Sequence, residues 1–196
     1  MLILVRHGES TGNAARLLLG RQEAPLTERG RAQARSVGAA LPKVGSVVTS
    51  SLGRARETAA AWDLDQPATV DDRWIEVDYG VHDGQPLTDV PADVWRSWRA
   101  DPDFVPEGGE SLASAGLRVR AACEELFAMK GAGARADEPV VVVSHVTPIK
   151  LAVCWALGLG DEGTWSLYLA NASITSIDWG PVGPVLHQYN HTPWAS

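Results

Sequence analysis

The chain has 196 residues and a formal net charge of −7 at pH 7, and this length predicts one domain over 1–196 that buries about 70% of the surface exposed by its unfolded form. Its lysines and arginines form no block, which argues against a nucleic-acid partner. Its apolar runs fall short of roughly 18 residues, the length of a membrane span, so we expect no membrane partner.

The first half of the chain is predicted to alternate strands with helices. An unbroken apolar run, Leu2-Ile3-Leu4-Val5, predicts a buried strand over 2–6. Because this strand starts so early, it leaves no room for the charged and apolar parts of a signal peptide, and we expect a cytoplasmic protein. After a polar loop, Thr27 is the expected N-cap of a helix that runs to about Leu41. The further elements expected in this half are a strand over 46–49, a helix that is capped by Ser50-Ser51 and runs to Trp62, and a strand over 69–71.

The second half opens with a segment rich in proline, glycine and aspartate, about 81–110, which predicts a short inserted lid with one tryptophan-bearing helix near 93–99. Cys123 and Cys154 fall on apolar faces of two later helices, and without a Cys-x-x-Cys spacing they indicate a reducing compartment and no structural zinc. The elements expected after the lid are a helix over 111–129, a flexible link over 131–137, a strand over 140–143, a helix over 148–157 and edge strands over 173–179 and 184–189. The whole pattern predicts an α/β fold, a doubly wound and mostly parallel sheet with helices on both faces.

Two histidines each follow a buried strand of this predicted sheet. Arg6 and His7 follow the first apolar run, and His145 follows the run over 140–143. In open parallel sheets, ligands bind outside the carboxyl ends of the strands, so neighbouring strands would bring these three side chains together. One histidine after a strand is more often structural. Two in this arrangement, one of them in an Arg-His-Gly sequence, favour a functional site.

A group of arginines and histidines at one sheet edge predicts an anion site. Arginine is a planar, always-charged donor suited to phosphate. Arg54 is expected in the first turn of its helix, where backbone N–H groups and the helix dipole favour an anion. Gly8 lets the backbone pass close to a bound group. On its own, Arg54 would be interpreted as the partner of Glu57 in a surface salt bridge; beside the two histidines, a phosphate ligand is the better interpretation.

Other kinds of site fit the sequence less well. A metal is disfavoured because His7 and His145 have no obvious third ligand beside them and the neighbouring arginines would repel a cation. Ser144 lies outside any Gly-x-Ser-x-Gly motif, and the phosphate-binding loop of P-loop proteins is missing. The remaining interpretation is a histidine that attacks phosphorus as the neutral imidazole and divides the transfer into two steps.

The segment Leu4-Val5-Arg6-His7-Gly8-Glu9-Ser10-Thr11-Gly12-Asn13 resembles the hallmark segment of the histidine phosphatase superfamily, the phosphoglycerate-mutase-like proteins. The further stretches that match in the family's order are its Pro-Leu-Thr helix at 25–34, its second-arginine helix at 50–59, its acid-bearing loop at 76–80, Gly108-Gly109-Glu110-Ser111 and Ser144-His145. The match covers residues 2 to about 150, roughly three quarters of the chain. The first segment alone is moderately specific, whereas all the pieces in order are strongly specific.

This resemblance implies that His7 becomes transiently phosphorylated. The residues that it places around the phosphoryl group are Arg6, Arg54, His145 and Asn13. The family uses no metal or other cofactor, because the arginines and the second histidine supply the positive charge, and catalysis is mostly positioning and charge stabilisation. The resemblance therefore implies a metal-independent phosphomonoester phosphatase.

A carboxyl group must also protonate the leaving oxygen and later help water to attack the phosphohistidine. Glu76 matches the family's acid position; the alternative is that it pairs with Arg73 or caps a turn. The sequence departs from the family just downstream, where the common Trp-Glu-Gly is replaced by His82-Asp83-Gly84. Asp83 is therefore the second candidate for the acid, and His82 is expected at the mouth of the site.

The lid segment bears on the choice of substrate. The phosphoglycerate mutases of this superfamily are longer and carry extra basic residues for a second phosphate, whereas here acidic residues outnumber Arg96 and Arg99. This favours a phosphatase of a small phosphorylated metabolite over a mutase, and the complete residue set favours both over a non-catalytic phosphoester-binding module. Trp95 and Trp98 either cover the substrate or pack the lid onto the body. We expect a monomer or a homodimer.

Overall fold

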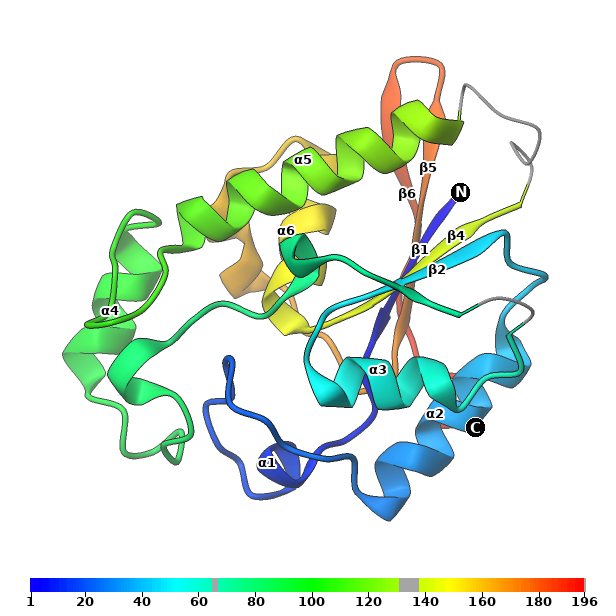
Figure 1. Cartoon of the computed structure of the whole chain (residues 1–196). Coiled ribbons are helices and arrows are strands. Elements are labelled where there is room, and N and C mark those ends of the chain that lie inside the picture. The colour runs from blue at the N-terminus through cyan, green and yellow to red at the C-terminus, as the bar shows by residue number, and fades with distance from the viewer. Residues whose placement is uncertain (65–66, 131–137, 196) are drawn as a thin grey trace.

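The computed structural model describes residues 1–64, 67–130 and 138–195, and the link expected over 131–137 lies outside them (Figure 1). The described chain is built around one six-stranded sheet in the order β3-β2-β4-β1-β5-β6. Its strands are β1 (Leu2–Arg6), β2 (Ser46–Thr49), β3 (Thr69–Val70), β4 (Val140–Ser144), β5 (Ile174–Gly180) and β6 (Gly183–His191).

The two strands that precede the histidines are neighbours. β1 and β4 pair in parallel, with Leu2 opposite Val140 and Arg6 opposite Ser144. β2 and β3 continue the parallel part, whereas β5 and β6 are antiparallel, which confirms a mostly parallel sheet. The prediction that β5 is an edge strand is wrong, because it pairs with β1 on one side and β6 on the other. Only its first half is buried, and the exposed end around Trp179 gives it the composition of an edge.

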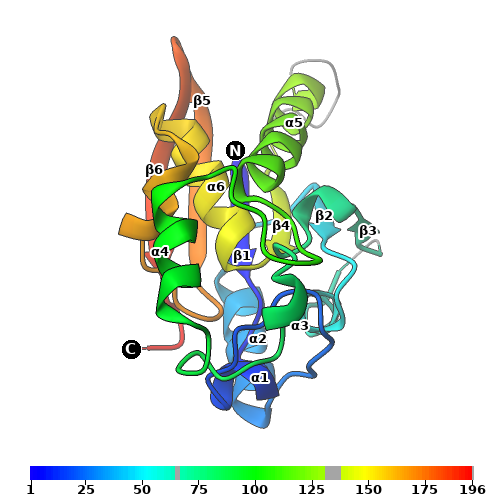
Figure 2. The same ribbon diagram turned by 90° about the vertical axis from the view of Figure 1, so that its left-hand side faces the viewer.

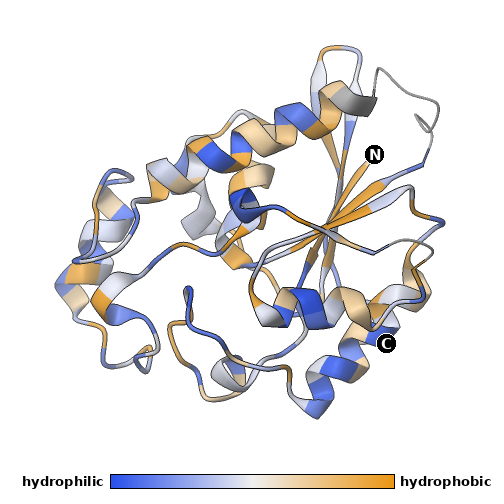
Figure 3. Cartoon of the chain, viewed as in Figure 1, coloured by the Kyte–Doolittle hydropathy of each residue, from blue (hydrophilic) through white to orange (hydrophobic). Residues whose placement is uncertain are grey.

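Helices cover both faces of the sheet, as the fold prediction requires. The α-helices are α1 (Thr11–Ala14), α2 (Glu28–Ala40), α3 (Gly53–Ala60), α4 (Ala92–Ala100), α5 (Leu112–Lys130) and α6 (Val146–Leu157). Alternate residues of β1 point to opposite faces: Ile3 packs in one core cluster with Val37 of α2, and Leu4 packs in another with Val119 of α5. Because both faces are covered, the central strands are apolar along their length, as Figure 3 shows.

The starts of the helices agree only in part with the predictions. Thr27 is the N-cap of α2, and its hydroxyl accepts a hydrogen bond from the Gly30 N–H at 2.9 Å. By contrast, α3 begins at Gly53, and its N-cap is Leu52, whose side chain makes no capping hydrogen bond. The prediction that Ser50 and Ser51 cap this helix is therefore wrong. α6 begins two residues earlier than expected, directly after His145, because Pro148 needs no N–H partner in a first turn.

The segment expected to form a lid packs against the body through aromatic side chains. Trp98 of α4 is buried in a small cluster with Leu18 and Val90. Arg99 lies over the ring of Trp165, 5.7 Å from its centroid. Trp165 belongs to the last of three 3-10 helices, which are η1 (Asp72–Trp74), η2 (Gly80–His82) and η3 (Asp161–Ser166). α4 thus stands apart from the sheet, beside η3 (Figures 1 and 2).

The cysteines lie where the apolar helix faces were predicted. Cys123 of α5 and Cys154 of α6 are both free and buried. No helix within 1–64, 67–130 or 138–195 is long and apolar enough to cross a membrane.

Candidate active site

The parallel pairing of β1 and β4 brings His7 and His145 together. The ladder continues past the last strand residues, because the His7 N–H donates to the Ser144 carbonyl at 3.0 Å. The segments that follow β1 and β4 therefore leave the sheet at adjacent points. The two imidazole rings lie 5.1 Å apart between centroids. Both side chains are buried, at 3% and 1% exposure. The expectation from the strand ends, that these side chains meet, describes the geometry well.

His7 is held as a neutral imidazole, and its Nε2 has no hydrogen-bond partner among the described residues. Its Nδ1 lies 2.7 Å from the carbonyl oxygen of Gly8, and because a carbonyl only accepts, Nδ1 carries the proton and Nε2 the lone pair. Burial lowers the pKa of His7 well below its usual 6.5, and the positive charges of Arg54 and Arg6 lower it further. A neutral imidazole with a free Nε2 lone pair is the reactive form of a histidine nucleophile.

Arg6 supplies one of the two cations beside His7. Its Nη1 donates to the Leu169 carbonyl at 2.7 Å, which fixes the guanidinium, while its buried Nε has no partner among the described residues. Burial lowers the pKa of Arg6 to about 10, partly offset by the negative charge of Glu76. The group remains charged at neutral pH, with donor capacity that the protein does not use.

Arg54 is the second cation, and it is fully buried in the first turn of α3. Two of its nitrogens donate to carbonyls of the loop before α2: Nη1 to Gln22 at 2.9 Å and Nη2 to Gly20 at 2.6 Å. Its Nε donates to Nδ1 of His145 at 3.3 Å. The alternative pairing with Glu57 is not made, since that carboxylate accepts from the Leu26 N–H instead.

His145 has protein partners on both ring nitrogens. Nδ1 accepts from Arg54, so Nε2 carries the proton and donates to the Ser50 hydroxyl at 2.8 Å. Burial lowers the pKa of His145 well below 6.5, with further contributions from Arg54, His7 and Arg6. The ring is therefore neutral and fixed in orientation. Ser50, expected as a helix cap, is instead the residue that holds this second histidine.

The Glu76 carboxylate lies against the amino end of α6, although the residue belongs to the loop after η1. Its Oε1 accepts from the Val77 N–H at 2.8 Å and its Oε2 from the Thr147 N–H at 3.3 Å. The suggested pairing with Arg73 is absent, because that arginine contacts Asp71 and Glu125. The carboxylate does cap a first turn, and it is 3% exposed. Burial lowers the pKa values of Arg6 and Arg54, and the negative charge of Glu76 opposes both shifts, so it lies within electrostatic reach of both cations.

The Asp83 carboxylate binds the backbone of the loop that holds Arg54. Its Oδ1 accepts from the Gly20 N–H at 2.7 Å, and its Oδ2 accepts from the N–H groups of Arg21 at 2.7 Å and Gln22 at 2.9 Å. The carbonyls of Gly20 and Gln22 are the two that accept from Arg54. The chain of contacts therefore runs from the Asp83 carboxylate through this loop to the guanidinium.

Asn13 is oriented by a residue that sequence reasoning missed. Its Oδ1 accepts from Nδ2 of Asn171 at 2.9 Å and from the backbone N–H of Ser10 at 3.1 Å, which leaves its amide N–H groups to point the other way. The next residue, Ala172, donates its N–H to the His7 carbonyl at 3.0 Å with a positive φ of 50°. This turn carries no glycine to mark it in the sequence.

Two backbone features near the anion site are used within the protein itself. A Cβ on Gly8 would lie 2.3 Å from the Gly30 carbonyl oxygen, so Gly8 is required by close contact with α2, whatever it does for a ligand. The amino end of α3 is occupied by the protein itself, because the Gly53 N–H donates to both carboxylate oxygens of Glu23, at 3.1 and 2.9 Å. The anion-binding capacity at this edge therefore lies in the arginine side chains.

The described residues at this edge do not form the hydrolase serine site or the metal site considered from the sequence. The Ser144 hydroxyl is buried and donates to the Trp74 carbonyl at 2.6 Å, so it is a structural group. Among the residues that the structure describes, no three histidine, cysteine or acidic side chains cluster in a way that could hold a metal ion. The candidate reactive groups described at this edge are imidazole, guanidinium and carboxylate side chains.

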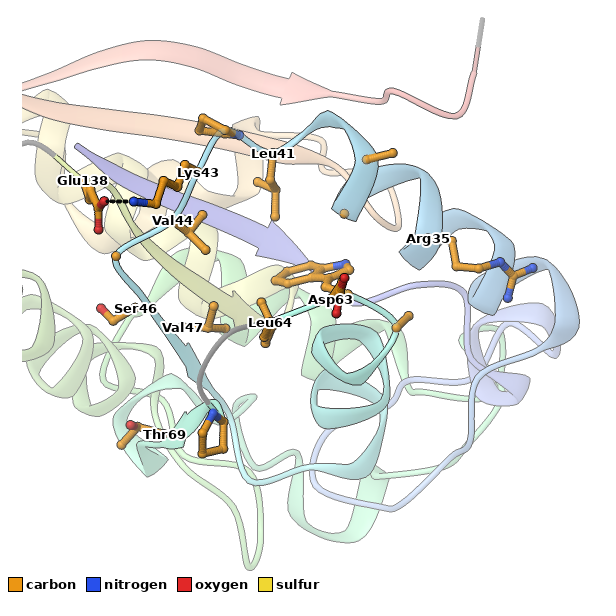
Figure 4. Close-up of a pocket in the computed structure, with 17 residues that line it drawn as sticks. Arg35, Leu41, Lys43, Val44, Ser46, Val47, Asp63, Leu64, Thr69 and Glu138 are labelled. Carbon is orange, nitrogen blue, oxygen red and sulfur yellow. Dashed lines mark ion pairs between the residues drawn. The ribbon is translucent and has the colours of Figure 1, made fainter.

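A second, wide pocket lies at the other end of the sheet (Figure 4). It has a volume of about 900 Å³, and Lys43 and Glu138, which form an ion pair, are among the residues that line it. Its lining includes Ser46 at the amino end of β2, whereas the histidines follow the carboxyl ends of β1 and β4. It is therefore separate from the candidate active site.

Comparisons with known proteins show the family to which the chain belongs. The family model of the histidine phosphatase superfamily (branch 1) matches residues 2–192. Phosphoserine phosphatase 1 of Hydrogenobacter thermophilus is 35% identical over 90% of this chain and 85% of its own, and a probable phosphoglycerate mutase of Yersinia enterocolitica is 30% identical over 98% and 86%. The structure of a mycobacterial glucosyl-3-phosphoglycerate phosphatase with VO3 superimposes with a TM-score of 0.86 at 29% identity, covering 97% of this chain and 98% of that one. The chain therefore belongs to the histidine phosphatase superfamily, a family of phosphatase enzymes, and the resemblance seen in its sequence extends over nearly its whole length.

Proposed function

We propose that this protein is a metal-independent phosphomonoester phosphatase that works through a phosphohistidine intermediate on His7. The observation that carries the proposal is the state of that side chain. It is neutral, its Nδ1 proton is bound by the Gly8 carbonyl, and its Nε2 lone pair lies beside two fixed arginines. The phosphohistidine mechanism is general for the family, and relatives with phosphatase names support hydrolysis as the outcome.

In the first step, Nε2 of His7 forms a bond to phosphorus while the bond from phosphorus to the ester oxygen breaks. The phosphoryl group then carries its charge on three equatorial oxygens, where Arg6 and Arg54 provide N–H donors that are already fixed by the protein. Because the cations are fixed beforehand, little reorganisation is needed when charge develops. His145 is proposed to lie beside the phosphoryl group as a neutral ring that orients Arg54, because both of its ring nitrogens already have protein partners.

Glu76 is proposed as the acid that protonates the departing alkoxide. In the second step the same carboxylate, now ionised, accepts a proton from water as that water attacks phosphorus, which releases phosphate and restores neutral His7. Glu76 is buried, lies within electrostatic reach of both arginines and is held by two N–H donors. Asp83 is proposed as a positioning residue, because all the contacts of its carboxylate are to loop N–H groups.

The proposed substrates are small phosphorylated metabolites, and the proposed location is the cytoplasm. The free, buried state of Cys123 and Cys154 supports a reducing compartment. A phosphoglycerate mutase is the alternative that one relative's name favours. The lid contributes few cations to hold a second phosphate, and this supports the phosphatase.

Turnover of phenyl phosphate in excess EDTA tests the proposal. We expect phosphate release at the same rate with EDTA, with added Mg²⁺ and after exhaustive dialysis. Activity that requires a divalent ion would overturn the metal-independent mechanism. Binding of phosphate without any turnover between pH 4 and 8 would instead support a non-catalytic binding module.

A further inference from the structure

A small cavity lies on the side of the active site that Glu76 occupies. It has a volume of about 150 Å³ and lies between α4, α6 and η3. Most of its walls are apolar or aromatic, and the side chains that make them are Leu18, Val77, Tyr79, Trp95, Trp98, Leu112, Val146 and Trp165. Walls of this kind suit the carbon frame of a small ligand.

The cavity and the catalytic carboxylate share two residues. Val77 and Thr147 donate their N–H groups to Glu76, and both also line the cavity. Tyr79 lines it too, with its hydroxyl 3.3 Å from the Thr147 hydroxyl. The proposed acid must face the leaving oxygen, so a space next to that carboxylate is placed to receive the alcohol part of a phosphoester.

Among the described residues that line the cavity, Lys150 is the one that carries a charge. It lies on α6 one turn after Val146, which is also a lining residue. It is half-buried, and no described residue forms a hydrogen bond or an ion pair with it; burial lowers its pKa, and the Glu76 charge opposes that shift. A partly desolvated ammonium without a partner is unfavourable in the empty site and gains most from an anionic ligand group.

We infer that the cavity binds the leaving alcohol and that Lys150 binds a carboxylate on it, so that the substrates are small phosphomonoesters of carboxylate-bearing alcohols. This inference rests on the proposed function. A single ammonium among apolar walls matches one negative charge better than the two of a second phosphate. The nearest arginines of the lid do not add to it, since Arg96 and Arg99 are both exposed and neither lines the cavity.

The test compares two esters that differ in charge alone. In 4-(carboxymethyl)phenyl phosphate and its amide, 4-(carbamoylmethyl)phenyl phosphate, a methylene insulates the phenol, so the two leaving groups have nearly the same pKa. We expect the wild type to show a kcat/KM ratio of carboxylate to amide of about 10–100, the range of one charge-assisted contact. Lys150→Gln should reduce this ratio to about 1, and Lys150→Arg should retain most of it.

Arg96→Gln is the matched control, because it removes one positive charge from the exposed face of α4 without touching the cavity. It should leave the ratio unchanged. A wild-type ratio near 1 would overturn the inference while leaving the phosphatase intact, and a lack of turnover of both esters would overturn the proposed function itself. If Lys150→Gln lowers kcat equally for both esters and shifts the pH profile, then Lys150 acts on Glu76 and binds no carboxylate. Thermal unfolding of each variant shows whether the fold is retained.

Discussion

Replacement of Asp83 by asparagine separates a positioning role from an acid role. In the wild type, Oδ1 accepts one backbone N–H and Oδ2 accepts two, from Gly20, Arg21 and Gln22. Asparagine keeps one carbonyl oxygen but presents an NH₂ group at the second position, where it meets donors. Asp83→Asn therefore preserves the shape of the side chain and loses either the one bond to Oδ1 or the two bonds to Oδ2, depending on which way the amide is turned.

The upper limit of the effect follows from the loss of two bonds. Hydrogen bonds to a charged acceptor contribute about 1.5–3 kcal/mol each, and because the loop is partly exposed we take the lower value, about 3 kcal/mol in total. This energy orders the loop whose Gly20 and Gln22 carbonyls hold Arg54. Since 1.4 kcal/mol corresponds to a factor of about ten, kcat/KM should fall by at most about 100-fold.

The assay uses substrates whose leaving groups differ in basicity. If Asp83 positions Arg54, the variant loses contact with the phosphoryl group, and the loss should be the same for p-nitrophenyl phosphate and for an alkyl phosphate. If Asp83 is the acid, the alkyl ester should suffer far more, because p-nitrophenolate leaves readily without a proton. A loss confined to alkyl esters would refute the positioning role and assign the acid to Asp83.

The remaining predictions concern the acid, pH and the reaction type. Glu76→Gln should lower kcat for alkyl phosphates by about 10²–10⁴ and for p-nitrophenyl phosphate much less; equal losses for both would contradict an acid role. Burial, together with the nearby arginines, depresses the pKa values of His7 and His145 below 6.5, so the unfolded chain binds protons below pH 6.5 that the folded chain does not. Stability should therefore fall with decreasing pH below 6.5, by up to about 1.4 kcal/mol per pH unit for each histidine, and urea unfolding of His7→Gln should show a shallower fall than the wild type. With 3-phosphoglycerate and bisphosphoglycerate, the protein should release inorganic phosphate; efficient formation of 2-phosphoglycerate would support the mutase instead.

Local patterns predicted the parts of the fold that local forces determine. The central strands were recognisable because they are buried on both faces and so carry no polar alternation. The start of α2 was recognisable because Thr27 caps it by a contact within three residues. β5 was misplaced at an edge, because its position depends on pairing with β1, far away in the chain.

The same distinction applies to the site. His7, His145 and Arg54 were predictable because they follow strand ends or begin a helix, and the topology then brings them together. The roles of Ser50 and Asn171 were not predictable. Ser50 contacts a residue 95 positions away and Asn171 one that is 158 positions away. No local pattern encodes such contacts, and here they orient two of the candidate site residues, His145 and Asn13.

The central claim is that His7 becomes phosphorylated during turnover. Brief incubation with ³²P-labelled phenyl phosphate, followed by denaturation at high pH, should yield protein-bound label that is stable to base and lost in acid, as expected of a phosphohistidine. Peptide mapping should place it on His7, and His7→Ala should fold normally but carry no label and release no phosphate. Label that persists in His7→Ala, or turnover by that variant at the wild-type rate, would contradict the account.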